Sequence, residues 1–290
     1  MRSRTKNDLS LDHLQAELAR IDVLIHREVR RWQLAGQDPT DNFRGLYVSD
    51  VEAKGLLRRP FGASWGQTVA LEPEEAQAFA DAYAQAAHRA QSLAEEAQGQ
   101  GQTPRLVHLA TAFGLDRFDL DTFLICLAPA LDLRYERLYG YLQDDVTRKR
   151  PRVNLVLDLL CQATSSDRGL LLLRFFDDAP LLRYDLLERV PASDSDQSSL
   201  LSQVLSVDPA IVAWLLGRYQ PHVDLGAHAT LLRPQKNKVD ELLAAEAIRG
   251  EALEKCISPL LIMEVDIQTR STTSRRVIWV FRCLISISLR

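Results

Sequence analysis

Apolar residues that recur at helical spacing constrain the fold of this chain more than any other feature. In residues 9–34 they follow one another at steps of three, four and seven, which places them on one face of a long helix. The stripe consists of Leu11, Leu14, Leu18, Ile21, Ile25 and Trp32. We predict that this helix packs on its own domain. A short coiled coil with a partner is the alternative, although coiled coils are recognised by three or four sustained heptads.

A second helix is predicted from an alanine-rich segment that starts at Pro73. Proline suits the first turn of a helix, where its missing N–H costs no hydrogen bond. The Gln/Gly run at residues 98–102 ends this helix. That run is the clearest domain boundary in the first half of the chain. We therefore assign residues 1–100 to a helical N-terminal region.

Two shorter helices follow the boundary and resemble a helix-turn-helix. The first begins at Thr103 and Pro104, a capping residue and a first-turn proline. Gly114 then turns the chain, and Asp116 caps the next helix. Residues 116–131 take the position of a recognition helix, which Pro129 is expected to end or bend.

The next part of the chain predicts two more helices, at residues 150–163 and 165–176, and then two runs compatible with β-strands. These runs, at 181–190 and 199–208, flank a polar turn, and Asp208 with Pro209 starts a last helix. Helices followed by a hairpin are typical of a winged helix. The predicted fold is mainly α (α+β), with a winged-helix domain at residues 103–232 and a helical linker at 233–256.

The last segment, residues 257–290, differs in composition from the rest. Alanine and glycine are absent from it and isoleucine becomes frequent, whereas the body of the chain is rich in alanine, leucine and arginine. We hypothesise that after about Pro259 the sequence is read in a shifted frame. A genuine pair of C-terminal strands is the competing explanation. The nucleotide sequence of the locus would decide between them.

Composition limits the class of protein. The chain is 46% hydrophobic and 26% charged, as in ordinary globular proteins, and its net charge of -4 gives no overall attraction to nucleic acid or anionic lipid. It has no apolar stretch of the roughly 20 residues that a membrane span needs, and its start has no apolar signal segment. The cysteines form no C-x-x-C pair. We expect a cytoplasmic protein without membrane contact.

The charged stretch YLQDDVTRKRPRV, residues 141–153, contains the candidate site residues. These are Asp144, Asp145, Arg148, Lys149, Arg150 and Arg152. The adjacent carboxylates point about 100° apart on a helix and cannot clamp one metal ion. The residues that flank the basic run are acidic, whereas a nucleic-acid patch repeats basic residues along one face. We therefore predict a joint between two helices, whose charges cap a helix end and contact a neighbouring element or a partner.

No catalytic, cofactor or metal site is predicted. None of the six histidines lies at metal-ligand spacing from a cysteine or an acidic motif. No cysteine can be paired with a histidine from the sequence as a nucleophile and its base. We expect the chain not to be an enzyme.

Several stretches together resemble one bacterial family. They are RIDVLIHREVRRWQLAGQDPTDNFRGLYVSD, LATAFGLDRFDLDTFLICLAPALDLRYERLYGYLQDDVTRKRPRVNLVLDLL and DAPLLRYDLLERV. They resemble the N-terminal, winged-helix-containing region of AAA-type ATPases associated with extracellular contractile injection systems. The resemblance covers about residues 15 to 245. It implies that an ATPase module follows, with a phosphate-binding loop, a Walker B acidic pair and an arginine finger.

The sequence matches none of those ATPase parts. A phosphate-binding loop needs G-x-x-x-x-G-K-[ST], and the last glycine of the chain, Gly250, is followed by no such pattern. We therefore expect a region truncated before the Walker A motif, with no cofactor, since ATP and Mg belong to the intact family. The expected function is non-catalytic recognition of a protein partner or of further copies of the chain, without nucleic acid. A winged-helix DNA-binding regulator and a subunit of an ATP-dependent AAA assembly factor are the alternatives.

Overall fold

The computed structural model describes most of the first three quarters of the chain and three strands beyond them. The described residues are 8–35, 50–59, 62–64, 66–161, 167–190, 199–218, 229–232, 261–267 and 275–281. The chain divides into two compact units, Met1–Leu216 and Gly217–Arg290. Ser49, predicted to cap a helix, and the predicted linker at 233–256 lie outside the described residues.

The first unit is mainly helical and contains one small antiparallel sheet, which confirms the predicted fold class. Its order is α1 (Leu9–Leu34), α2 (Asp50–Arg58), η1 (Gly66–Thr68), α3 (Pro73–Gly99), α4 (Arg105–Phe113), α5 (Arg117–Leu131), α6 (Arg134–Leu142), α7 (Val153–Leu160), α8 (Asp167–Leu172), η2 (Leu173–Phe175), α9 (Pro180–Arg183), β1 (Leu187–Val190), η3 (Leu200–Ser202), β2 (Val204–Val207) and α10 (Pro209–Leu215). None of the described helices is long and apolar enough to cross a membrane.

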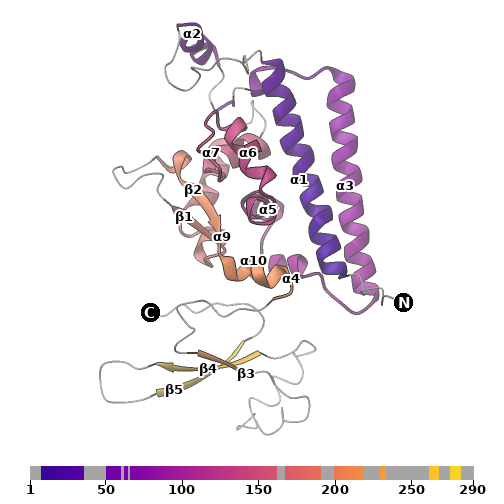
Figure 1. Ribbon diagram of the computed structural model, residues 1–290, viewed down its shortest axis with the longest axis vertical. Coiled ribbons are helices and arrows are strands. Elements are labelled where there is room, and N and C mark those ends of the chain that lie inside the picture. The colour runs from indigo at the N-terminus through magenta and orange to yellow at the C-terminus, as the bar shows by residue number, and fades with distance from the viewer. Residues whose placement is uncertain are drawn as a thin grey trace. The chain divides into compact units, whose positions relative to one another are not determined.

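The long helices α1 and α3 run side by side along one edge of this unit (Figure 1). α1 buries most of the predicted stripe, including Leu14, Ile21, Ile25 and Trp32. It contacts α3 and also α4, α5, α6 and α7. The stripe therefore packs on its own domain, as predicted. α3 starts at Pro73 and ends at the predicted Gln/Gly run.

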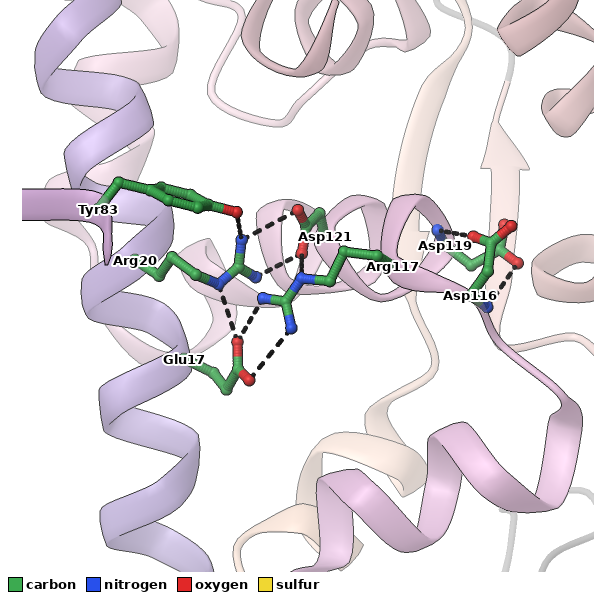
Figure 2. A network of polar contacts seen from close by, with 7 residues as sticks. All are labelled: Glu17, Arg20, Tyr83, Asp116, Arg117, Asp119 and Asp121. Carbon is green, nitrogen blue, oxygen red and sulfur yellow. Dashed lines mark hydrogen bonds and ion pairs between the residues drawn. The ribbon is translucent and has the colours of Figure 1, made fainter. Parts of the chain in front are cut away.

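A buried network of charges joins α1 and α3 to α5 (Figure 2). Arg20 of α1 is 1% exposed, and its guanidinium forms a bidentate ion pair with Asp121 of α5. Arg20 also donates to the Tyr83 hydroxyl of α3 at 2.6 Å. Glu17 bridges Arg20 and Arg117 at 3.0 and 2.7 Å. Residues on both sides of the predicted boundary at 98–102 thus belong to one compact unit.

Helix α5 lies in the core, so its assignment as a recognition helix was wrong. Asp116 caps it as predicted, within a capping box that Asp119 completes. Phe123, Leu124 and Leu127 are fully buried, and Pro129 is accommodated within the last turns. All residues of α5 from Asp121 to Ala128 are buried, so this part of the helix has no exposed face with which to read DNA. α4 begins at Arg105, with Pro104 rather than Thr103 at its cap.

A winged-helix arrangement of helices and hairpin lies between Pro151 and Val207. Backbone at Pro151 and Arg152 is paired with β2, since Arg152 forms an isolated bridge with Val204 and the Leu205 N–H donates to the Pro151 carbonyl at 2.9 Å. Helices α7 and α8 follow this bridge, and β1 and β2 form the predicted antiparallel hairpin with Leu187 opposite Val207. α8, which η2 continues, is the second of these helices, and the short helix α9 stands between η2 and β1, where the sequence predicted the start of a strand.

The second unit contains a three-stranded antiparallel sheet in the order β3 (Ala229–Leu232), β4 (Leu261–Ile267) and β5 (Arg275–Phe281). Ile262 pairs with Val280, and Leu231 with Met263. The atypical tail thus forms the strand pair that the sequence left open as an explanation. The reading-frame hypothesis stays a prediction for the nucleotide sequence.

Candidate functional site

The charged stretch 141–153 is a joint between α6 and α7, as the sequence predicted. α6 ends at Leu142, and Asp144 takes a left-handed φ of 54°. The Gln143 side chain connects the end of α6 to the backbone that leads into α7. Its amide donates to the carbonyls of Arg148 and Arg150 at 2.9 and 3.0 Å, and its oxygen accepts from the Arg152 N–H at 3.2 Å.

The six candidate residues do not form one surface. Asp145 accepts from the Thr147 backbone and hydroxyl at 2.9 and 2.6 Å, and these hydrogen bonds lower its pKa. Lys149 lies 3.9 Å from Glu136 of α6, and Arg150 donates to Ser206 of β2 at 3.0 Å. The other three residues line a cavity, and they are Asp144, Arg148 and Arg152.

Helix α8 is fastened to α7 by a buried ion pair. Arg168 of α8 donates to Asp158 and to Asn154 of α7, at 2.8 and 2.9 Å. Burial raises the pKa of Asp158 to about 7, although Arg168 opposes the rise. The Gln67 side chain of η1 donates to the carbonyls of Asp158 and Cys161 at 2.9 and 2.8 Å, which ties the same end of α7 to a third element.

The continuation of α8 is fastened to α5. Arg174 of η2 bridges the two capping carboxylates of α5, Asp116 at 2.7 Å and Asp119 at 2.5 Å. Phe175 is buried, with its ring 6.0 Å from that of Phe118 in an edge-to-face arrangement. Arg168, Arg174 and Phe175 each contact a neighbouring helix, and these contacts fix the orientation of the segment.

The opposite side of the same segment exposes apolar side chains, which we call the outer apolar face. It consists of Leu170, Leu173 and Phe176, which are 66%, 58% and 45% exposed. Exposed residues beside it are acidic, namely Asp167, Asp177 and Asp178. Large exposed apolar groups in a rigid segment are typical of protein-binding surfaces. Major-groove reading instead uses Arg, Lys, Asn or Gln side chains at these positions.

These features define a winged-helix protein: a backbone bridge to β2, two helices and a hairpin packed on a helical core. The comparison with known families agrees with that topology. The chain belongs to the family described as "Winged helix domain, variant", which matches residues 8–226, about three quarters of its length. No curated protein and no solved structure matched the chain.

The range that matches the family also includes α1 and α3, so these two helices belong to the matched region together with the winged helix. Sequence reasoning did not identify the outer apolar face. A signal for it was present in LLLLRFF, residues 170–176, because this run has more apolar residues than one buried side of a short helix needs. Among the described residues, no group of three His, Cys, Asp or Glu side chains is placed to hold a metal ion.

Proposed function

We propose that this winged-helix protein is a non-catalytic recognition module that binds a protein partner through the outer apolar face. The observation that carries the proposal is the exposure of Leu170 and Leu173 on a segment whose inward side is held by the Arg168 and Arg174 ion pairs. An apolar anchor on a rigid element binds without a large ordering cost. Leucine side chains of this kind contribute through burial against a partner.

A winged-helix DNA-binding regulator is the second candidate, which membership of the family favours. The outer apolar face opposes it, because the phosphates of DNA would meet Asp167, Asp177 and Asp178. Arg168 and Arg174, the basic side chains of this segment, are engaged in ion pairs with carboxylates. DNA binding depends on free cationic groups and is strongest at low salt. A mobility-shift assay with duplex DNA at low salt therefore tests this candidate, and we expect no shift.

The sequence resemblance supports a more specific proposal for the partner. We propose that the chain is the recognition region of an AAA-type ATPase of contractile injection systems, acting without a nucleotide-binding module of its own. In that role it binds a client protein or other subunits of the assembly. Calorimetry with Mg-ATP tests the non-catalytic part of the proposal. Tight, magnesium-dependent binding would contradict it.

The partner surface itself is tested by a charge substitution with a matched control. Leu173→Asp places a carboxylate in the outer apolar face, whereas Leu133→Asp changes a leucine that is 71% exposed at the start of α6. The protein and both variants are used to recover partners from the source cells. We expect a stoichiometric partner that is retained by Leu133→Asp and lost by Leu173→Asp. Equal retention by both variants would refute the surface.

A further inference from the structure

A cavity of about 780 Å³ is lined by residues of α8 other than those of the outer apolar face. The joint, α7, η3, residues 62–64 and the end of α2 with Arg59 also contribute to its wall. Its volume is within the range of small-molecule sites, roughly 300–1,000 Å³. The lining combines apolar side chains, such as Leu142 and Leu157, with an excess of basic groups.

Four arginines line the cavity, namely Arg59, Arg148, Arg152 and Arg168. The acidic residues in the described lining are Asp144 and Asp158, so the balance is positive. Asp158 is already paired with Arg168 at 2.8 Å. The cavity therefore has more cationic charge than its own carboxylates neutralise.

Two of these guanidinium groups share their carboxylates with another arginine. Asp145 attracts Arg152 but forms its ion pair with Arg148, and Asp158 attracts Arg59 but forms its ion pair with Arg168. The Nε of Arg152 is buried without an acceptor among the residues that the structure describes. Burial, and then repulsion from Arg148, lowers the pKa of Arg152. Incompletely neutralised, part-buried arginines are costly for folding, and an anion that neutralises them recovers that cost.

Arg168 is also positioned to contact an anion in the cavity. Its Nη2 donates to Asn154 and Asp158, while its Nη1 has no acceptor in the described structure. The backbone at Gly62 packs directly on its side chain, since a Cβ placed there would lie 2.7 Å from Arg168 Cδ. Arg168 is thus fixed at the cavity wall with hydrogen-bonding capacity left over.

We propose that this cavity binds a small organic phosphate, whose phosphate group contacts Arg152, Arg168 and Arg59 and whose apolar part packs against Leu142 and Leu157. A dianionic phosphate matches several planar guanidinium groups better than a single carboxylate does. This site is independent of the proposed partner surface, because Arg168 and Leu172 of α8 face the cavity whereas Leu170 faces outward. It also needs no magnesium and no phosphate-binding loop.

The test is calorimetric titration of the full chain with 1-naphthyl phosphate, beside inorganic phosphate, 1-naphthoate and neutral 1-naphthol. We expect 1-naphthyl phosphate to bind most tightly, with or without magnesium. Arg152→Gln should weaken it about tenfold, the loss expected for one charge-assisted hydrogen bond. Lys149→Gln is the matched control, because it removes a charge from the same basic run at a residue outside the described lining, and it should change the affinity less than about twofold.

A second measurement separates ligand binding from folding. Arg152→Gln removes an incompletely neutralised charge, so the ligand-free variant should melt at the same or a higher temperature than the original protein. 1-Naphthyl phosphate should raise the melting temperature of the original protein and not that of the variant. The proposal is overturned if no probe binds, if 1-naphthol or 1-naphthoate binds as tightly as the phosphate, or if Lys149→Gln weakens binding as much as Arg152→Gln does. None of these outcomes affects the partner surface, which the Leu173→Asp variant tests separately.

Discussion

Arg20 shows how much of this fold depends on single residues that the sequence does not single out. It is the largest fully buried side chain, and its partners Tyr83 and Asp121 are 63 and 101 residues away. Helical spacing relates residues that are three or four apart, so no local pattern reveals such pairs. Burial raises the pKa of Asp121 to about 6, against the influence of Arg20. Removing one member of this buried network should therefore lower the free energy of unfolding.

Arg20→Leu should destabilise the protein strongly. It leaves the buried carboxylate of Asp121 without its bidentate partner, a loss of about 3–5 kcal/mol in the free energy of unfolding. The measurement is urea denaturation at neutral pH. Arg134→Leu is the control, because Arg134 and its partner Asp22 are 56% and 37% exposed. Such a surface pair contributes about 1 kcal/mol or less. Equal losses for the two variants would contradict the account of the network.

Stability should fall as the pH rises toward 7. The folded pKa of Asp158 is raised from 3.8 to about 7, so between these values the folded protein holds a proton that the unfolded chain has released. Unfolding then becomes easier with rising pH, by up to about 1.4 kcal/mol per pH unit for one group. Asp121 adds an effect of the same sign up to pH 6.

Denaturation curves at intervals between pH 4.5 and 8, for the original protein and Asp158→Asn, test this dependence. Asparagine cannot titrate, so the variant should lose most of the slope between pH 6 and 7, where Asp121 no longer contributes. An equal slope between pH 6 and 7 in the original protein and in Asp158→Asn would show that Asp158 is ionised throughout this interval.

At the scale of elements, the sequence predicted the helices with apolar stripes well and their roles less well. The extents of α1 and α3, the cap at Asp116 and the hairpin all agree with the structure. The recognition helix was placed at α5 because a turn before it resembled a helix-turn-helix. The choice between α5 and α8 depends on pairing of Arg152 with Val204, a contact 52 residues apart along the chain that local propensity cannot show. The cavity depends on the same long-range arrangement.

The two sides of the α8–η2 segment should respond differently to substitution. Phe175→Ala removes a buried ring that packs against Phe118, and should cost about 3–5 kcal/mol in stability. Phe176→Ala, one residue further on, changes a ring of the outer apolar face and should stay within about 0.5 kcal/mol. Thermal or urea unfolding of both variants compares them directly. A large loss for Phe176→Ala would mean that this face is part of the core.

At the scale of the whole molecule, residues 1–216 form one compact unit, in which α1 packs against α4, α5, α6 and α7. The sequence boundary at 98–102 is a turn between α3 and α4 within that unit. Composition and glycine content marked the turn correctly. They could not show that α1 contacts α4, α5, α6 and α7, because such contacts follow from the tertiary arrangement.

Separation at that turn should abolish folding. A fragment of residues 103–218 exposes the surface of α5, α6 and α7 that α1 covers, and Asp121 loses its ion pair with Arg20. We expect this fragment to be aggregated or to lack a cooperative unfolding transition, whereas residues 1–218 should unfold in one step. Circular dichroism with thermal denaturation distinguishes the two. Cooperative unfolding of the shorter fragment at the same midpoint would establish two independent domains.

The central claim is that the winged helix contacts protein, and not nucleic acid, through the outer apolar face. Site-specific photo-crosslinking in the source cells tests it most directly, with the photoreactive amino acid p-benzoylphenylalanine placed at Leu173 and, as a control, at Leu133, which is also exposed. The account predicts a discrete, nuclease-resistant and protease-sensitive adduct at position 173 that is absent at position 133. An adduct at position 173 that nuclease removes, or identical adducts at the two positions, would contradict it.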